Sequence, residues 1–100
     1  MHAVRVQYTV RPDFAETNAA NIRDVMAELA ATGEAGIQYS AFRTGDGNTF
    51  VHLVVMDDES KRDVVPGLAA FQRFRAALRE GAVVPPDNET WQVVGTSYAL

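Results

Sequence analysis

The segment 37–56 reads IQYSAFRTGDGNTFVHLVVM, and it contains two strand-like runs on either side of a turn. Residues 37–43 alternate in polarity, and residues 49–56 are rich in β-branched and aromatic side chains; both patterns are typical of strands. Between them, the tetrapeptide Gly-Asp-Gly-Asn at 45–48 supplies residues that tolerate positive φ. The segment therefore predicts a β-hairpin in the middle of the chain.

Upstream of the hairpin, the pattern predicts a strand followed by a helix. Residues 3–11 alternate between apolar and polar side chains, and Pro12 ends this strand because it has no backbone N–H. From Asp13 onward the apolar residues recur every three to four positions, which is the period of an amphipathic helix. We expect Asp13 to cap this helix together with Glu16, and Gly33 to end it.

Downstream of the hairpin, a second helix and a last strand complete the pattern. We expect a short helix near 61–65, broken by the Pro-Gly pair that follows, and then an amphipathic helix over 68–81. The segment 85–88 contains two prolines and predicts a stiff loop, and 90–98 predicts the final strand. The order β-α-β-β-α-β predicts an α+β, ferredoxin-like fold: a four-stranded antiparallel sheet with both helices on one face.

Composition and charge limit the possible functions. The 100 residues allow one domain, 1–100, and 47% apolar with 22% charged residues is ordinary globular composition. The chain has no cysteine, which excludes disulfides, thiolate metal sites and a cysteine nucleophile. A net charge of −4 disfavours binding to nucleic acid or to an anionic membrane. No apolar run approaches the ~20 residues of a membrane helix, so we expect a soluble cytoplasmic domain.

The register of the hairpin decides which side chains share a face of the sheet. A three-residue turn at 45–47 would bring aromatic, apolar and hydrogen-bonding residues together on the uncovered face, as in the wall of a small-molecule pocket. These residues are Arg5, Gln7, Thr9, Gln38, Ser40, Phe42, Phe50, His52, Val54 and Met56. The face expected under the helices carries Val4, Val6, Tyr8, Val10, Ile37, Tyr39, Ala41, Val51, Leu53 and Val55. A two- or four-residue turn would place the side chains of one strand on the opposite face.

His52 is the main catalytic candidate because it is the only histidine outside the N-terminus. Imidazole titrates near neutral pH, so His52 could act as a general base or orient a phenol or carbonyl. The alternative is a histidine that is hydrogen-bonded across a dimer for structural reasons. Gln7 and Arg5 would orient the substrate, although Arg5 could equally pair with a carboxylate of a partner subunit.

Five further side chains are candidate substrate contacts. They are Tyr39, Phe42, Phe50, Met56 and Trp91. Core or dimer packing is the alternative for the aromatic residues, and for Tyr39 it is the favoured interpretation. Asn18 in the first helix could point toward the sheet and need a partner there, but exposure is the simpler account. We expect no metal, since His2 and His52 share no ligand spacing, and no nucleotide-binding or serine-hydrolase motif is present.

Segments along almost the whole chain resemble one superfamily. The resemblance rests on residues 8–12, 39–53, 68–74 and 91–98. In these segments the chain is similar to the dimeric α+β barrels, near the antibiotic-biosynthesis-monooxygenase-type domains and their small members without an assigned activity. The resemblance implies that two copies join their open sheet faces and that each keeps a cavity between sheet and helices or at the barrel mouth.

The activities of this superfamily are diverse, so the resemblance alone does not give a reaction. It includes cofactor-free oxygenases of aromatic polyketides, haem-degrading enzymes, lyases, isomerases and stress-induced proteins. Haem-degrading relatives share an amide at the position of Gln7, but Met56 stands where they have tryptophan, and 66–80 contains no histidine. Many oxygenases carry Glu-x-Trp where this chain has His-Leu-Val at 52–54. We therefore expect no cofactor.

Three hypotheses follow from the residues and the resemblance together. The first is a homodimeric, cofactor-independent enzyme, such as a monooxygenase or isomerase, acting on a small aromatic or enolisable substrate through His52, Gln7 and Arg5. The second is a non-catalytic dimer that binds a small ligand or serves in a stress response. The third is an interaction module whose open face is filled by its partner. A partly polar cavity around His52 would favour the first two.

Overall fold

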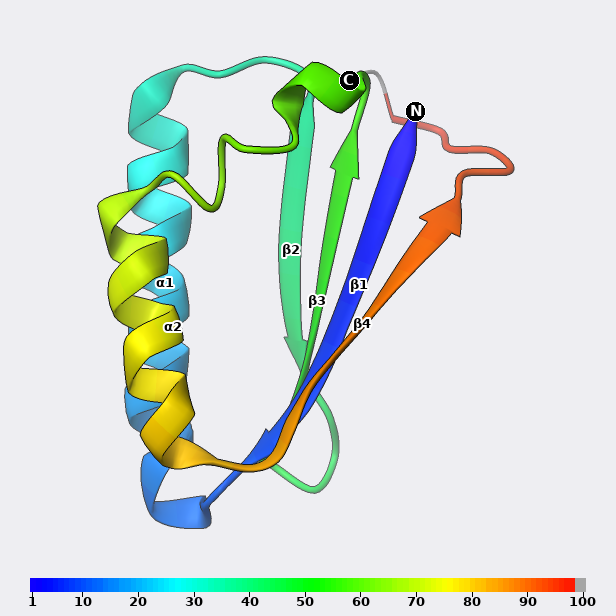
Figure 1. The fold of residues 1–100 in the computed structure, drawn as a ribbon. Coiled ribbons are helices and arrows are strands. Elements are labelled where there is room, and N and C mark those ends of the chain that lie inside the picture. Colours follow the sequence, from blue (N-terminus) through cyan, green and yellow to red (C-terminus); the bar gives the residue numbers. More distant parts are fainter. Residues whose placement is uncertain (99–100) are drawn as a thin grey trace.

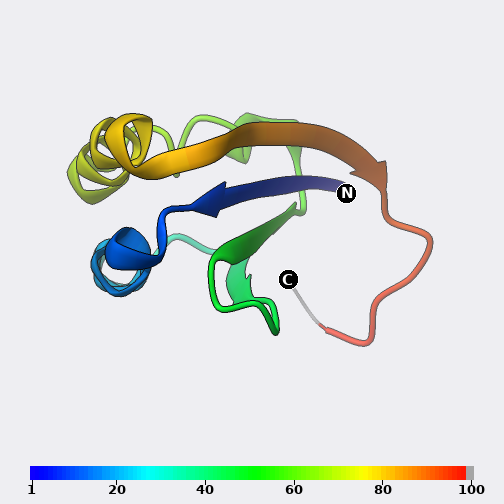
Figure 2. The same ribbon diagram turned by 90° about the horizontal axis from the view of Figure 1, so that it is seen from below.

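The computed structural model describes residues 1–98. It contains one antiparallel sheet with two helices on one side. The elements are β1 (His2–Val10), α1 (Ala15–Thr32), β2 (Ile37–Arg43), β3 (Thr49–Met56), α2 (Ala69–Gly81) and β4 (Ala82–Gln92), with 3-10 turns η1 (Pro12–Phe14) and η2 (Glu59–Lys61). The strands lie in the order β2-β3-β1-β4. Figures 1 and 2 show α1 and α2 side by side on one face, which confirms the predicted ferredoxin-like fold.

The main core lies between the helices and the face of the sheet that they cover, here called the inner face. The apolar stripe of α1 and that of α2 meet the inward side chains of the central strands. The buried residues are Tyr8, Val10, Ala15, Ala19, Ile22, Val25, Phe50, Leu68, Ala70, Phe74 and Leu78. The apolar residues that recur every three to four positions in both helices are therefore the ones buried against the sheet, as expected.

The predicted end of α1 is confirmed and its predicted cap is wrong. Gly33 ends the helix with φ of 67°, a left-handed conformation that glycine adopts without steric cost. At the other end, the 3-10 turn η1 precedes the helix, which starts at Ala15 without a side-chain cap. Asp13 instead pairs with Arg11 at 3.0 Å, and Glu16 pairs with Arg43 on β2 at 2.8 Å.

The hairpin register differs from the prediction by one residue. The N–H of Thr44 donates to the carbonyl of Thr49 at 2.9 Å, so the loop has four residues, Gly45 to Asn48. A carboxylate oxygen of Asp46 accepts the N–H groups of Asn48 and Thr49 at 2.8 and 2.9 Å and holds this loop closed. A shift of one residue turns every side chain of a strand to the opposite face. The side chains of β3 therefore point to the faces opposite to those predicted.

The side chains of β1 and β2 therefore face as predicted, and those of β3 do not. Phe50, His52, Val54 and Met56 point to the inner face, opposite Val6 and Tyr8 of β1. Val51, Leu53 and Val55 belong to the other face, here called the open face, because their register partners there are Gln7, Arg5 and Ala3.

The last strand also departs from the prediction. Residues 85–88 were expected to form a loop and 90–98 a strand, but β4 covers Ala82–Gln92 and contains both prolines. Proline is tolerated here because β4 is an edge strand and its register against β1 shifts between the pairs Gln7–Asp87 and Thr9–Val84. This strand brings Asn88 opposite Val6, on the inner face.

The connection after β3 contains a 3-10 turn in place of the short helix that was expected. A helix near 61–65 was predicted, and the structure has a 3-10 turn at Glu59–Lys61. Asp58 caps this turn, because its carboxylate accepts the N–H of Ser60 at 2.7 Å. Within residues 1–98, neither helix is long and apolar enough to cross a membrane.

Candidate functional site

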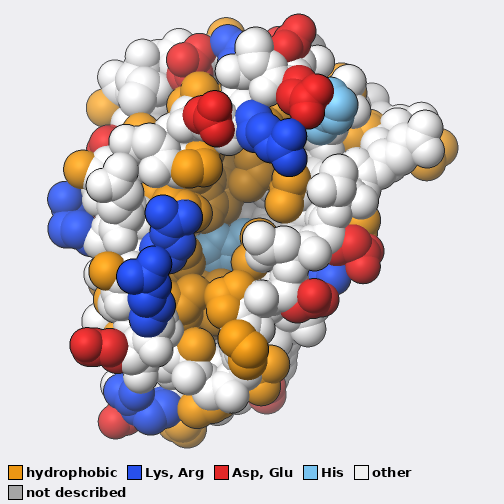
Figure 3. Space-filling view, viewed as in Figure 1, with side chains coloured by type: hydrophobic (Ala, Val, Ile, Leu, Met, Phe, Trp, Pro, Cys, Tyr) orange, Lys and Arg blue, Asp and Glu red, His pale blue; other side chains and the backbone are white. Residues whose placement is uncertain are grey.

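A cavity of about 550 Å³ lies between the inner face of the sheet and α2. Its walls are mainly apolar and come from β1, β3, the segment after β3, and α2; they include Val4, Val6, Val54, Phe71 and Phe74. Figure 3 shows this hollow from its open side, with orange apolar walls and a histidine side chain at its floor. An apolar hollow with a few polar groups is the usual form of a small-molecule site.

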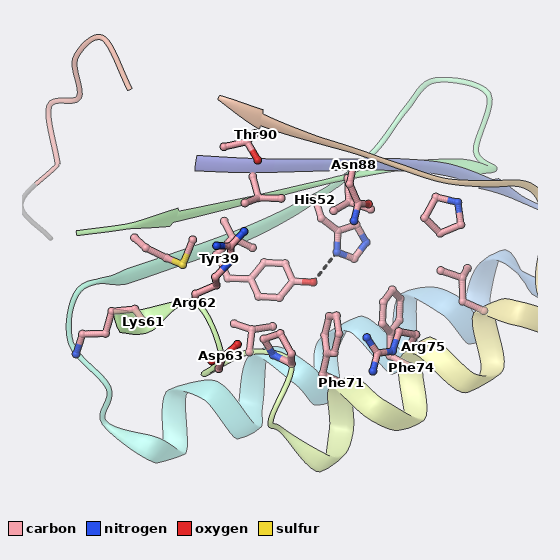
Figure 4. A pocket seen from close by; sticks show the side chains of 18 of the residues that line it. Tyr39, His52, Lys61, Arg62, Asp63, Phe71, Phe74, Arg75, Asn88 and Thr90 are labelled. Atoms are coloured by element: carbon pink, nitrogen blue, oxygen red, sulfur yellow. Dashed lines mark hydrogen bonds between the residues drawn. The ribbon is translucent and has the colours of Figure 1, made fainter. Parts of the chain in front are cut away.

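Four polar side chains form a hydrogen-bonded chain, here called the buried polar chain, that runs from α1 to the cavity. The amide Nδ2 of Asn18 donates to the Tyr8 hydroxyl at 2.8 Å. The same hydroxyl lies 2.8 Å from Nε2 of His52, and Nδ1 of His52 lies 2.6 Å from the Tyr39 hydroxyl. Figure 4 shows this last contact, with the Tyr39 ring reaching across the cavity to His52.

Burial keeps the members of this chain uncharged. Removal from water lowers the pKa of His52 from 6.5 to about 4, so its imidazole is neutral at pH 7. Burial also raises the pKa of the Tyr8 and Tyr39 hydroxyls well above the usual value, and the hydrogen bond from Asn18 offsets only part of this at Tyr8. At neutral pH, His52 is therefore uncharged, with one ring nitrogen that donates a hydrogen bond and one that accepts.

The hydrogen bond that Asn18 donates to Tyr8 favours one tautomer of His52. The Tyr8 oxygen already accepts from Asn18, so its own hydrogen needs an acceptor, and Nε2 of His52 is the one within reach. The remaining imidazole hydrogen then sits on Nδ1 and is donated to the Tyr39 oxygen. The hydrogen of the Tyr39 hydroxyl is consequently left for a group in the cavity.

We predict that Tyr8→Phe lowers the free energy of unfolding by about 1–3 kcal/mol, because the change leaves Nε2 of His52 and the Asn18 amide buried without this partner. Urea unfolding followed by circular dichroism measures the difference. Tyr98→Phe is the matched control, since the Tyr98 side chain is 65% exposed and its hydroxyl is solvated. If Tyr8→Phe and the wild type have equal stability, the buried polar chain does not contribute to the stability of the fold.

Other polar side chains surround the cavity. Asn88 and Thr90 reach it from β4, across the sheet from Tyr39 and His52, as Figure 4 shows. Lys61, Arg62, Asp63 and Arg75 lie at its mouth. No group of three or more histidine, aspartate or glutamate side chains among residues 1–98 is arranged to hold a metal ion.

The structure separates the predicted site residues into two sets. His52, Tyr39 and Met56 line the cavity, and Phe50 lies beside it in the core, stacked on Tyr8 with ring centroids 5.7 Å apart. Arg5, Gln7, Phe42 and Trp91 are on the open face.

The expected grouping of His52 with Gln7 and Arg5 is therefore wrong. On the open face, Arg5 pairs with Asp87 at 3.1 Å and Glu89 at 3.5 Å of the same chain and contacts Gln7 at 3.4 Å.

Sequence reasoning missed three residues of the site. The sequence correctly placed Tyr8 on the inner face, but no hydrogen-bond partner was predicted for its hydroxyl. Asn18 was expected to be exposed and is fully buried; its place in the apolar stripe of α1 was the available signal. Asn88 was assigned to a loop because of the two prolines before it.

Comparisons with known proteins identify the fold. Neither a scan against protein-family models nor a search of the curated proteins finds a match to this sequence. Solved structures do match, among them a structure described as an antibiotic biosynthesis monooxygenase, with a TM-score of 0.78, 15% identity, and coverage of 95% of this chain and 100% of that one. This chain has the fold of the antibiotic biosynthesis monooxygenases.

Two further solved structures share this fold. Rv0793 from Mycobacterium tuberculosis has a TM-score of 0.78 and 18% identity, with 97% of this chain and 98% of that chain covered. A variant of SnoaB, a cofactor-independent oxygenase from Streptomyces nogalater, has a TM-score of 0.66 and 18% identity, with 96% and 95% covered. The antibiotic biosynthesis monooxygenase fold predicted from the sequence is therefore confirmed, and identities this low carry the fold alone.

Proposed function

We propose that this chain is a cofactor-independent enzyme that binds a small aromatic or enolisable molecule in the inner cavity and stabilises its enolate or phenolate form. The observation that carries the proposal is the position of the Tyr39 hydroxyl, which lines the cavity with its oxygen 2.6 Å from Nδ1 of His52. With Nδ1 as the donor, the phenolic hydrogen is free for a ligand. A hydrogen-bond donor that is positioned in advance, in an apolar surrounding, stabilises a developing oxyanion more strongly than water does.

In this proposal each member of the buried polar chain has a separate role. Tyr39 contacts the substrate oxygen and is the catalytic residue. His52 is a positioning residue, since its Nδ1–H fixes the Tyr39 oxygen and leaves the phenolic hydrogen free. Tyr8 and Asn18 in turn fix the His52 tautomer. Phe71 and Phe74 provide a surface for a flat ring.

The substrate first loses its C–H or O–H proton to solvent at the open side of the cavity. The enolate or phenolate held in this way can then follow two courses. Protonation at a different carbon gives an isomer. Reaction with dioxygen at a methylene carbon gives a carbonyl: one oxygen atom enters the product, and the other leaves as water with the two hydrogens of the methylene. The comparison with SnoaB, described as a cofactor-independent oxygenase, favours the second course. Neither course needs a bound metal or organic cofactor.

The proposal includes a homodimer formed through the open face. This face carries Phe42 and Trp91, which are 56% and 42% exposed, together with the half-buried Val51, Leu53 and Val55. Neither helix covers it in Figure 2. An apolar patch of this kind on a small chain without disulfides favours association, because a second copy removes it from water.

We predict that Leu53→Lys, at the centre of the open face, converts this dimer to a monomer. Burying an unpaired ammonium at an apolar interface costs several kcal/mol, enough to dissociate a dimer at micromolar concentration. Sedimentation velocity gives the mass of the wild type and variant. Gln72→Lys on the exposed side of α2 adds the same charge away from the open face and should remain dimeric. A wild-type protein that is still monomeric at about 100 μM would exclude the dimer.

A screen of aromatic and enolisable compounds by thermal shift tests the function. A ligand that binds the native state raises the unfolding temperature. Compounds that bind are then incubated with the protein under air and under argon, and products are separated by chromatography. Conversion that needs dioxygen supports oxygenation, and conversion under argon supports isomerisation. Binding with no conversion in either case favours the alternative function, a non-catalytic small-ligand-binding or stress-response dimer.

A further inference from the structure

The segment between β3 and α2, residues 57–68, is here called the strap. Among residues 1–98 it is the one part of the cavity wall that belongs to neither a strand nor an α-helix. Its lining residues are Lys61, Arg62, Asp63, Val65 and Pro66. In Figure 4 the labelled residues of the strap lie at one end of the cavity, and Phe74 and Arg75 of α2 lie at the other. Most residues of the strap are exposed, whereas Val65 is buried on its cavity side.

The backbone of the strap is attached to the rest of the protein only at its two ends. Within the described chain, all backbone hydrogen bonds of residues 58–67 stay inside the strap. At its first end, the N–H of Asp57 donates to the carbonyl of Gly36 at 2.9 Å. At its other end, Leu68 is buried in the core, and the carboxylate of Glu28 accepts the first two N–H groups of α2 at 3.1 and 2.8 Å.

One ion pair attaches the middle of the strap to the rest of the protein. Nζ of Lys61 lies 2.9 Å from a carboxylate oxygen of Glu34, which belongs to the connection between α1 and β2. The other side-chain hydrogen bonds and ion pairs that the strap makes within residues 1–98 stay inside it. The two side chains of the pair are 26% and 36% exposed, and ion pairs that water reaches are weak.

The hydrogen bond between Tyr39 and His52 is poorly accessible when the strap is in this position. The side chain of His52 is 3% exposed, and both of its ring nitrogens have tyrosine partners. Moving the sheet or α2 would open the close-packed core that lies between them. Moving the strap breaks the Lys61–Glu34 pair and removes the apolar contacts of Val65. The strap is therefore the wall that moves at the lowest cost in free energy.

We propose that the strap is a lid that moves to admit molecules to the Tyr39–His52 end of the cavity, with the Lys61–Glu34 ion pair as its latch. The movement leaves the sheet and both helices in place. A partly exposed ion pair changes an equilibrium constant by about two- to fivefold, so the latch favours the closed position without preventing opening. The inference concerns access to the cavity and does not depend on the proposed reaction.

The test measures how fast a reagent reaches His52 in the full chain. Diethyl pyrocarbonate acylates neutral imidazole, and in a His2→Gln background His52 is the only histidine. Peptide mass spectrometry gives the acylation rate of His52 at pH 7. We expect Glu34→Gln and Lys61→Gln each to raise this rate about two- to fivefold. The double variant should match either single variant, because both changes remove the same bond.

Glu59→Gln is the matched control. It removes the same charge as Glu34→Gln and breaks the pair of Glu59 with Arg62 at 3.0 Å, which lies wholly inside the strap. Its acylation rate should equal that of the background protein. Sodium chloride at about 1 M should raise the rate of the background protein and leave that of Glu34→Gln unchanged, because salt screens the latch.

A series at low urea concentration separates movement of the lid from unfolding of the whole chain. A lid exposes little surface when it opens, so the acylation rate should be nearly constant below the unfolding transition. The proposal is overturned if the rate rises with urea as steeply as the unfolding constant, if Glu34→Gln has the background rate, or if Glu59→Gln accelerates acylation equally. Unchanged turnover in Tyr39→Phe would refute the proposed function and would leave these rates unaffected.

Discussion

Lowering the pH from 7 to 4 is expected to reduce the free energy of unfolding by about 3 kcal/mol through His52 alone. Burial lowers the pKa of His52 from 6.5 to about 4 in the folded chain. In that interval the unfolded chain binds a proton that the folded chain does not, so protons favour unfolding. The stability is complete above pH 6.5, falls as the pH decreases, and the loss is complete once the pH is below about 4.

The measurement is a series of urea unfolding curves between pH 7 and pH 5, above the range in which carboxylates titrate. Between pH 6 and pH 5 the slope should approach ~1.4 kcal/mol per pH unit, the value for uptake of one proton. His52→Gln should remove this slope. His2→Gln, which removes the exposed histidine at the start of β1, should keep it. A wild-type protein with a flat profile would show that His52 is not buried as a neutral group.

Replacing Tyr39 by phenylalanine is expected to lower turnover by about 10²–10³-fold, the usual contribution of one positioned hydrogen-bond donor to an oxyanion. The ring and its packing remain, so the loss should appear in kcat with little change in KM, as for a bond that is stronger in the transition state. The measurement uses a compound that the thermal shift screen finds and the wild type converts. Its anaerobic and aerobic rates are compared in the wild type and the variant.

Two further variants separate catalysis from structure. Tyr98→Phe removes an exposed hydroxyl and should have wild-type turnover. Tyr8→Phe keeps Tyr39 but frees the His52 tautomer, so its turnover should lie between those of Tyr39→Phe and the wild type and its pH profile should shift. Full activity in Tyr39→Phe, with an intact fold by circular dichroism, would refute the assignment of Tyr39 as the catalytic residue.

The order of the elements was accessible from the sequence because it depends on local periods. The period of two in 3–11 and 37–43 and the period of three to four in the two helices are properties of neighbouring residues. They predicted the fold class, the inner faces of β1 and β2 and the glycine end of α1, all of which the structure has. The resemblance to the antibiotic biosynthesis monooxygenases followed from the same pattern.

The contents of the site were not accessible in this way. β3 is apolar on both faces, with Val51, Leu53 and Val55 on one side and Phe50 and Val54 on the other, so its pattern does not choose between them. The hydrogen bonds of Asp46 close a four-residue loop and make that choice.

Sequence alone thus determined which segments become strands and helices, because propensity and periodicity act over a few neighbouring residues. Tertiary structure decided that His52 lies under the helices between Tyr8 and Tyr39, that Asn18 is buried beside them and that Asn88 belongs to an edge strand. The physical reason is that a buried polar group needs a partner, and each partner here comes from a different part of the chain.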